Sequence, residues 1–412
     1  MKKILVLFLL CGIGLGAWAQ NSDSPVAVDA VNGLAVDLYK KLAAENDGNL
    51  FLSPYSISDA LAMTYGGARG ATAQEMAKVL YFPEEQKNLH ESFLTLNAGI
   101  EKVQQKGEVT LNTANALWLQ SDYKEVDDHF QCKDEFLKLL KDYYQSELNR
   151  VDYRDQSKSA FIRDTINVWV EKKTNSKIKN LIPPDVPSPN TRLILVNAVY
   201  FKGKWENEFK KDNTRRMLFD LYGVKSQAVQ MMSQSGSFPY YEDDACKVLE
   251  LPYKDRDLSM VIILPNAKDG LKVLERELTA QRLKILLNHK GISPVDVYLP
   301  KFQLENEYEL ADRLKTMGMP LAFDGAHADF TGMADFPSGN NLYISQVIHK
   351  AFVDVYEEGT EAAAATAVIM HVGSATSKPF FVADHPFLFL IKDNKTGVIL
   401  FIGRYVGEED KK

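Results

Sequence analysis

Helix-type and strand-type residue patterns are segregated along this chain of 412 residues. Apolar residues at helical spacing come first, at residues 32–44, at 55–65 after a Ser-Pro cap, and at 157–174. Runs rich in β-branched and aromatic residues follow at 193–201, at 259–264, and at 387–391 with 398–402, where a turn-rich link predicts a hairpin. Because the two kinds of pattern do not alternate, the chain is predicted to be an α+β protein and not a series of βαβ units.

The first residues have the order of a secretory signal peptide. Two lysines precede an apolar run, and Ala17-Trp18-Ala19 supplies small residues at the cleavage positions. The run is too short for a membrane span. We therefore expect residues 1–19 to be removed after Ala19, residues 20–30 to form a linker, and the protein to be secreted or periplasmic. Lipidation of Cys11 in a surface lipoprotein is the weaker alternative, because Leu10 stands where a small residue is expected.

The composition argues against several classes of function. A net charge of −7 makes nucleic acid or an anionic membrane a poor partner. The seven histidines have no metal-binding spacing, and no common hydrolase, nucleotide or zinc motif occurs. We expect no enzymatic activity, no metal and no organic cofactor. Besides Cys11 there are only Cys132 and Cys246, too few for a disulfide framework, and the sequence leaves open whether they pair.

The most unusual segment runs from Glu357 to Pro379. It has no proline before Pro379, and between Ala362 and Val372 the only ionisable residue is His371. An exposed alanine-rich helix is one interpretation, because alanine has high helix propensity. Such a helix would have no apolar stripe wide enough to dock it. Small side chains without proline or charge also suit a strand that enters an existing sheet.

The residues around the start of this segment favour a strand that enters a sheet over an exposed helix. Residues 353–356 are strand-like, and Gly359 follows as a hinge that permits unusual backbone angles. Glu361, the only charged residue just after the hinge, falls on one face of an extended strand. The opposite face carries only small or uncharged side chains: Thr360, Ala362, Ala364, Thr366 and Val368. This pattern predicts a segment that can become a buried strand.

Five motifs resemble, in the right order, those of the serpin family. They are 49–58 (NLFLSPYSIS), similar to the start of helix B; 197–205 (NAVYFKGKW), similar to the third central strand; 299–302 (LPKF), similar to the sixth strand; 357–366 (EEGTEAAAAT), similar to the hinge; and 383–391 (ADHPFLFLI) with Gly403-Arg404, similar to the C-terminal signature. The resemblance implies the serpin fold, with three β-sheets, eight to nine helices and an exposed reactive-centre loop. The domain would span residues 31–408, with the loop at about 357–379 and a charged tail at 409–412.

The resemblance also implies an activity. Inhibitory serpins are metastable proteins that are cut in the loop by a protease, which they trap as an acyl-enzyme while the cut loop inserts into the central sheet. The expected partner is thus a target protease in a covalent complex, with the inhibitor itself a monomer. A non-inhibitory carrier or chaperone and a cross-class inhibitor of cysteine proteases are the alternatives.

Individual residues take roles only through this resemblance. The hinge would comprise Glu357, Gly359, Thr360, Glu361, Ala362, Ala363, Ala364, Ala365 and Thr366. A hydrogen-bonded cluster under the central strands, the shutter, would comprise Ser53, Ser56, Asn197 and His349. The breach, where insertion begins, would contain Trp205, Thr214 and Lys301, and Lys301 would pair with Glu357.

The expected position of the scissile bond follows from its distance from the hinge in the serpin family. The family's usual spacing from Glu357 places it between Gly373 and Ser374, and shorter loops would place it after Val372 or after Met370. None of these residues suits the acidic pocket of a trypsin-like enzyme. Small and medium apolar residues favour elastase-like or subtilisin-like proteases.

Overall fold

The computed structural model describes residues 25–121, 131–146, 148–288, 291–335, 342–360 and 378–408. Within these ranges it contains nine α-helices and seventeen strands, so the predicted α+β class is confirmed. The helices are α1 (Val26–Glu45), α2 (Pro54–Tyr65), α3 (Gly70–Leu80), α4 (Gln86–Gln105), α5 (Asp134–Tyr144), α6 (Ser159–Lys173), α7 (Leu271–Glu277), α8 (Ala280–Asn288) and α9 (Ala311–Met317).

The strands form three sheets in the described residues. The six-stranded sheet has the order β11 (Phe302–Glu309), β13 (Gln346–Tyr356), β14 (Gly359–Thr360), β5 (Leu193–Lys204), β2 (Val109–Gln120) and β4 (Leu148–Val151). The nine-stranded sheet has the order β1 (Leu50–Leu52), β17 (Ile399–Tyr405), β16 (Phe387–Asp393), β9 (Leu258–Pro265), β8 (Cys246–Pro252), β7 (Lys225–Glu242), β10 (Gly291–Pro300) and β15 (Phe380–Val382), with β6 (Arg215–Leu221) also paired to β7. Strands β12 (Ala334–Asp335) and β3 (Gln131–Cys132) form a small third sheet.

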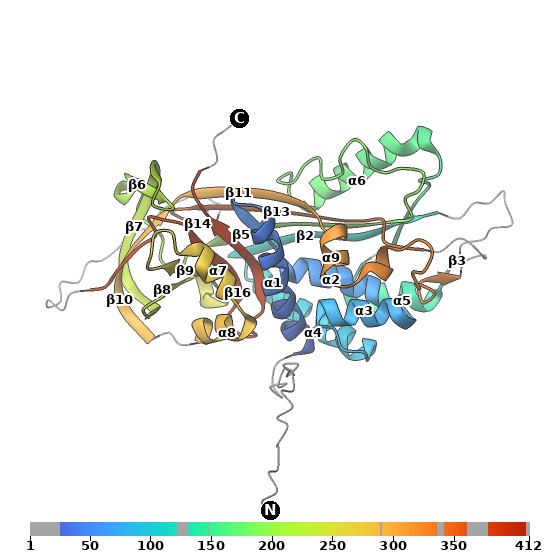
Figure 1. Cartoon of the computed structure of the whole chain (residues 1–412), viewed down its shortest axis with the longest axis horizontal. Helices are drawn as coiled ribbons and strands as arrows, with labels where there is room; N and C mark the ends of the chain where they lie inside the picture. The colour runs from blue at the N-terminus through green and yellow to red at the C-terminus, as the bar shows by residue number, and fades with distance from the viewer. Residues whose placement is uncertain are drawn as a thin grey trace, which may run out of the picture.

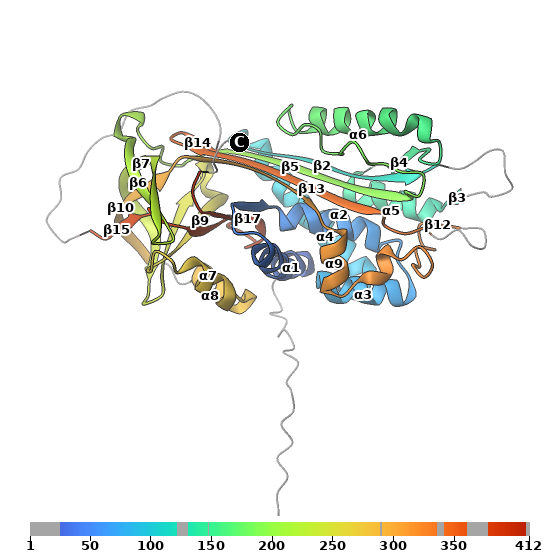
Figure 2. The same cartoon turned by 45° about the horizontal axis from the view of Figure 1, so that its top comes forward.

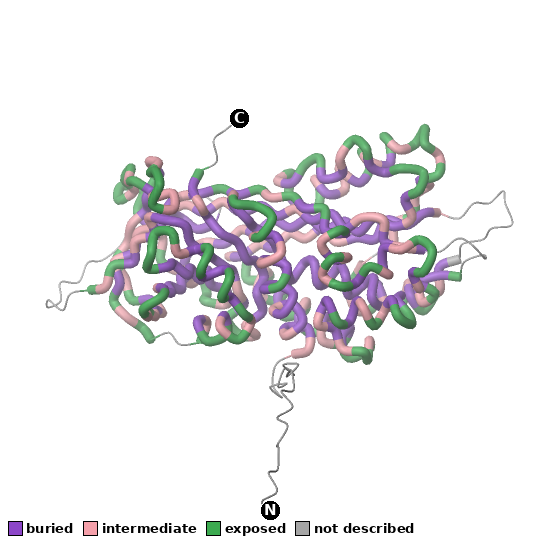
Figure 3. Tube along the Cα trace, viewed as in Figure 1, coloured by how far each residue is buried: buried purple, intermediate pink, exposed green. Residues whose placement is uncertain are grey.

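The six-stranded sheet is the central layer of the molecule (Figures 1 and 2). Helix α6 covers one face, and α2 with its neighbouring helices covers the other, while the nine-stranded sheet lies at one end (Figure 2). Strand β5 explains the layering, because its first nine residues are all buried. Alternate side chains enter opposite cores: Leu195 and Val199 face the large core on the α2 side, and Val196 and Ala198 face a smaller core under α6. The buried backbone runs through the middle of the molecule (Figure 3).

The start of the first helix and the buried face of α6 add to what the sequence predicts. Helix α1 begins at Val26, and Ala27, Val28 and Ala30 are buried, so the residues from 26 to 30 belong to a packed helix and not to a linker. In α6 the buried face is made by Ile162, Ile166 and Val170. Phe161 and Val168, two of the apolar residues within the predicted range 157–174, lie on the outer face of the helix and are 72% and 65% exposed.

The other predicted elements agree with the structure. The run 193–201 lies in β5, and 259–264 lies in β9. Strands β16 and β17 form the expected antiparallel hairpin. Cys132 and Cys246 are both buried and form no disulfide, which answers the question of pairing that the sequence left open. No helix in the described ranges combines the length and the apolar character needed to cross a membrane.

Candidate functional site

The central sheet contains a seam between β5 and β13. These strands pair directly and in parallel, from Ile194 opposite Gln346 to Tyr200 opposite Phe352. Beyond that point the chain turns back after Tyr356, and β14 lies antiparallel to both strands. Thr360 is opposite Val355 on one side and Gly203 on the other. The start of the expected hinge is therefore already placed between the two strands, at the end of the seam.

Gly359 makes this entry possible. Its φ is +151°, and a Cβ atom at this position would lie 2.2 Å from the carbonyl oxygen of Gly203 and 2.6 Å from the Cα of Lys204. No other residue type fits so close to a neighbouring backbone. The requirement for glycine at the hinge is thus steric as well as conformational.

Thr360 is fully buried in this position. Its Oγ1 lies 3.0 Å from the hydroxyl oxygen of Tyr253, which is itself buried. The ring of Tyr253 stacks on Trp205, with 4.7 Å between centroids and 11° between planes. Thr360 is the first residue of the face that the sequence predicted to be buried, and its side chain lies in the core. The other predicted hinge residues, Glu361, Ala362, Ala363, Ala364, Ala365 and Thr366, lie outside the described residues.

The carboxylate of Glu357 is held by two side chains on neighbouring elements. Lys301 Nζ lies 2.8 Å from its Oε2, and Thr214 Oγ1 donates to its Oε1 at 2.7 Å. Burial acts to raise the pKa of Glu357, but the hydrogen bonds from Lys301 and Thr214 outweigh it and leave the pKa below its usual value. The ionised carboxylate therefore fixes the position at which the chain leaves β13.

The segment after β5 holds the turn through its backbone. The indole Nε1 of Trp205 donates to the carbonyl of Tyr356 at 3.0 Å, and the Trp205 amide donates to the carbonyl of Glu358 at 3.1 Å. Lys211, whose role the sequence did not suggest, pairs with the buried carboxylate of Glu358 at 2.6 Å. The expected breach residues Trp205, Thr214 and Lys301 thus all contact residues 356–358.

The four expected shutter residues meet lower in the seam. Asn197 and His349 are directly opposite each other in the β5–β13 pairing, and the His349 Nδ1 hydrogen-bonds to the Asn197 Oδ1. The Ser53 amide donates to His349 Nε2 at 3.1 Å, so the ring proton of the neutral histidine is on Nδ1. Asn197 Nδ2 donates to the Ser56 Oγ at 2.6 Å. All four residues are buried, and they tie both strands of the seam to the start of α2.

Burial sets the protonation of His349. It lies in the interior with its ring stacked near Tyr308, and burial lowers its pKa to about 3. The imidazole is therefore neutral at physiological pH, which the acceptor role of Nε2 requires.

The cluster continues to residues that the sequence analysis missed. Asn197 Nδ2 also donates to Asn115 Oδ1 at 2.6 Å, and Asn115 Nδ2 donates to Asp59 Oδ2 at 3.1 Å. Asp59 lies on α2, whose twelve residues are all buried, and it is the only charged residue of that helix. A single carboxylate within an otherwise uncharged, fully buried helix was the signal that could have identified it. Burial raises the pKa of Asp59 to about 6.

The expected scissile residues Met370, Val372, Gly373 and Ser374 lie outside the described part of the chain. Within that part, no group of three or more histidine, cysteine, aspartate or glutamate side chains could hold a metal ion.

Comparison with known proteins gives one consistent family. Residues 29–407 match the family model described as Serpin (serine protease inhibitor). Serpin B4 of Homo sapiens is 41% identical over 389 residues, which cover 90% of this chain and 96% of that protein. The leukocyte elastase inhibitor of Xenopus tropicalis is 42% identical over 383 residues, covering 91% of this chain and 98% of that protein. The crystal structure of Serpin48 from the insect Tenebrio molitor superposes with a TM-score of 0.81 at 31% identity, covering 95% of this chain and 100% of that chain.

Proposed function

The chain belongs to the serpin family, as its five motifs predicted, and we propose that it inhibits proteases by being cleaved and then trapping the enzyme. A serine protease attacks the carbonyl carbon of Gly373 with its own nucleophile, the amine of Ser374 leaves, and an ester links the two proteins. The segment before the cut then inserts between β5 and β13 and carries the protease with it before water hydrolyses the ester.

One observation supports this proposal most strongly: β14 already lies between the two strands and runs antiparallel to both. A strand that continues from Thr360 would replace the seven parallel residue pairs of the seam with two antiparallel ladders. About a dozen inserted residues at roughly 0.5–1.5 kcal/mol per net hydrogen bond would release on the order of 10 kcal/mol. This rivals the stability of an ordinary domain, so the uncleaved form would be kinetically trapped.

The side chains of the hinge also suit insertion. Thr360 faces the core beside Tyr253, and residues at every second position after it would face the same way. Those residues are Ala362, Ala364, Thr366 and Val368, all small or uncharged. A hinge spoiled by proline, charge or bulk would instead favour a non-inhibitory carrier or chaperone.

The residues around the expected scissile bond favour elastase-like or subtilisin-like targets, because Gly373, Val372 and Met370 are uncharged. To test this, the purified protein is mixed with pancreatic elastase, subtilisin and trypsin and run on denaturing gels. We expect a detergent-resistant band at the summed mass of both partners with elastase or subtilisin. The released peptide should have the mass of the fragment Ser374–Lys412.

Two other outcomes would change the conclusion. Loop cleavage without a complex, and without a gain in heat resistance, would indicate a non-inhibitory serpin. A complex with papain in place of the serine proteases would indicate the cross-class alternative.

Export is part of the proposal and rests on the sequence alone, because residues 1–24 lie outside the described range. Cleavage after Ala19 would leave Gln20 at the N-terminus. Mass spectrometry of the protein recovered outside the cytoplasm should show this terminus. An acylated N-terminal Cys11 would instead establish the lipoprotein alternative.

A further inference from the structure

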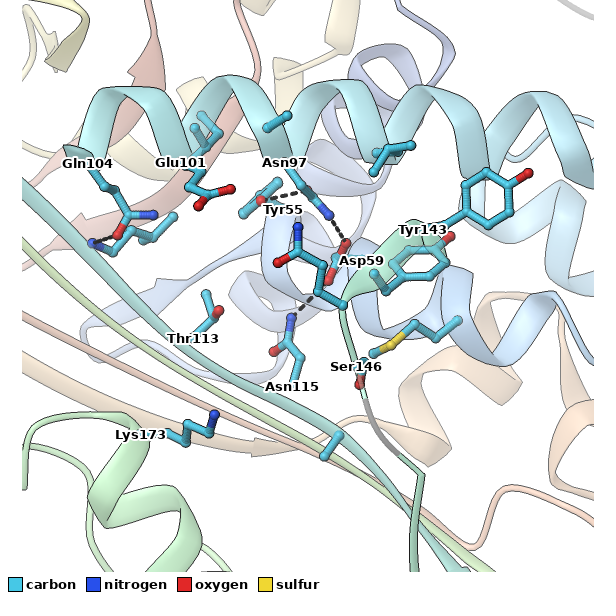
Figure 4. Close-up of a pocket in the computed structure, with 18 of the residues that line it drawn as sticks. Tyr55, Asp59, Asn97, Glu101, Gln104, Thr113, Asn115, Tyr143, Ser146 and Lys173 are labelled. Carbon is cyan, nitrogen blue, oxygen red and sulfur yellow. Dashed lines mark hydrogen bonds between the residues drawn. The ribbon is translucent and has the colours of Figure 1, made fainter. Parts of the chain in front are cut away.

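A cavity of about 440 Å³ lies beside the shutter cluster, at the edge of the six-stranded sheet (Figure 4). One wall is α2, which contributes Tyr55 and Asp59 from successive turns, and a second is α4, which contributes Asn97 and Glu101. The third wall is the part of β2 before Leu117. On the side away from β5, this part has no strand beside it among the described residues. This volume is within the range of small-molecule binding sites.

The carboxylate of Asp59 faces this cavity and carries an uncompensated charge. It accepts hydrogen bonds from Asn97 Nδ2 at 2.9 Å and from Asn115 Nδ2 at 3.1 Å. A carboxylate has about four acceptor positions, so these two bonds leave part of its capacity unused. No lysine or arginine in the described ranges forms an ion pair with it. Its pKa of about 6 leaves it mainly ionised at pH 7, at the cost of a buried charge without a cationic partner.

The other walls of the cavity favour a positive ligand. Glu101 supplies a second carboxylate, and Tyr55 and Tyr143 also line the space (Figure 4). Trp169 is a third aromatic residue of the lining. Aromatic faces attract ammonium and guanidinium groups. The one cation of the lining, Lys173, lies on the opposite side near Thr113 (Figure 4), with its Nζ 6.0 Å from the Trp169 ring centre.

We propose that this cavity binds a small organic cation, an ammonium or guanidinium group, through the carboxylate of Asp59. A metal ion fits less well, because the described residues contain no cluster of three ligating side chains. A single buried carboxylate with aromatic neighbours matches a planar or alkylated cation, which forms a charge-assisted hydrogen bond and stacks on rings.

The hydrogen bonds link this site to the seam. His349 donates to Asn197, Asn197 donates to Asn115, and Asn115 donates to Asp59, all in one direction. A cation on Asp59 offsets its buried charge and stabilises the uncleaved arrangement of this chain of donors. Occupancy therefore slows the parting of β5 and β13, a consequence that rests on the proposed function, whereas the binding itself does not.

Binding is tested with a pair of probes that differ in charge and hardly in shape. Methylguanidinium chloride and neutral methylurea are titrated into the full protein at equal ionic strength, with sodium chloride as the reference, and binding is followed by calorimetry and by the unfolding temperature. We expect saturable binding of methylguanidinium alone. Equal responses to both probes, or no saturable response to methylguanidinium, would overturn the proposal without any variant.

Variants then locate the site. Asp59→Asn keeps the size and an acceptor for Asn115 but removes the charge, and should weaken methylguanidinium binding by about tenfold or more. Glu101→Gln should weaken it less, because Glu101 is not held against the buried network. The matched control is Asp142→Asn, the same change at an exposed position of α5, which should leave binding unchanged. Unchanged affinity in folded Asp59→Asn would contradict the assignment.

A separate experiment tests whether cation binding affects inhibition. With a protease that forms the complex, saturating methylguanidinium should lower the rate of complex formation and raise the fraction of inhibitor cleaved without trapping. Methylurea at the same concentration should do neither. Cation binding in a protein that traps no protease would leave the site established and refute the proposed function. Trapping of a protease by a protein that binds no cation would establish the proposed function and refute the cation site.

Discussion

The hydroxyl of Thr360 lies 3.0 Å from that of Tyr253, in the core and between two strands of the central sheet. The expected inhibitory loop therefore does not begin at the molecular surface. Gly359 and Thr360, which follow the turn at its start, are already part of the sheet, and further insertion needs the seam between β5 and β13 to open. The contact between Thr360 and Tyr253 thus marks the last inserted position among the described residues.

Replacing Thr360 by arginine should convert the inhibitor into a substrate. A charged side chain cannot enter the buried space beside Tyr253 without a large desolvation cost, so insertion would fall behind hydrolysis of the acyl-enzyme. On gels with elastase or subtilisin, the complex band should disappear and the cleaved inhibitor should accumulate. Thr165→Arg on the exposed face of α6 is the matched control and should still form complexes. Stable complexes with Thr360→Arg would mean that insertion does not start at this hinge.

Replacing Gly359 by alanine should expel the hinge from the sheet. The added methyl group would meet the Gly203 carbonyl oxygen at 2.2 Å, so β14 has to leave its place between β5 and β13. We expect faster proteolysis of the hinge by a protease that the wild type resists there, and a lower unfolding temperature. Gly99→Ala is the control, because nothing lies within 4 Å of its Cβ position in α4. It should be neutral or slightly stabilising. Wild-type resistance at the hinge of Gly359→Ala would contradict the packing described.

Much of this arrangement follows from the sequence, for physical reasons that differ between elements. The run 193–201 is apolar at nearly every position because β5 is covered on both faces, and the N-cap Ser53 with Pro54 defines the start of α2. Gly359 and Thr360 could be predicted as a hinge because the residue types themselves indicate backbone freedom and a small side chain that can be buried.

Other features depend on distant pairings that the sequence does not display. Asn115 and Asp59 join the shutter only because β2 pairs with β5 in a register that places Asn115 opposite Asn197. The ion pair of Lys211 with Glu358 depends on the course of the chain after β5. The start of α1 at Val26 was missed because its first turn has little apolar contrast, and burial by the rest of the fold decides it.

Replacing Glu357 by glutamine should loosen the base of the hinge. The ionised carboxylate accepts hydrogen bonds from Lys301 and Thr214, and charge-assisted bonds to a buried group are worth roughly 1.5–3 kcal/mol. The folded pKa of Glu357 lies below its usual value of 4.5, so its contribution to the free energy of unfolding is present above pH 4.5 and is lost as the pH falls through the folded pKa. Urea titrations at neutral and acid pH should show the variant less stable at pH 7 and closer to the wild type near pH 3.

Two lysine variants test the ion pair at the hinge. Lys301→Met removes the lysine that pairs with Glu357. Lys315→Met is the control, because it removes a lysine from an exposed ion pair with Asp312 on α9. Exposed pairs contribute about 0–1 kcal/mol, so the control should change little. If Lys301→Met were as mild as Lys315→Met, the ion pair with Glu357 would not hold the hinge.

Asp59 predicts a pH dependence of opposite sign. Burial raises its pKa from 3.8 to about 6, so the folded protein binds a proton here more tightly than the unfolded chain does. The ionised group therefore lowers stability above pH 6, and this loss is relieved as the pH falls from about 6 to 3.8. A difference of about two pKa units corresponds to roughly 3 kcal/mol.

Asp59→Asn removes this titration and should be more stable relative to the wild type at pH 7.5 than at pH 4.5, as read from urea midpoints. The other ionisable side chains that line the cavity are Tyr55, Tyr143, Tyr144, Glu101 and Lys173. Burial holds the pKa of Tyr55 and of Tyr144 well above the usual value, so both stay neutral over this range. Glu101 is the other carboxylate of the lining, so Glu101→Gln serves as the control and should show a smaller pH-dependent difference. His349, with its pKa lowered to about 3, favours the folded state as pH rises through 3 to 6.5, and it is present in every variant compared, so its effect cancels. A pH-independent difference between Asp59→Asn and the wild type would mean that the charge of Asp59 is compensated within the protein, and that the cavity has no need of a cation.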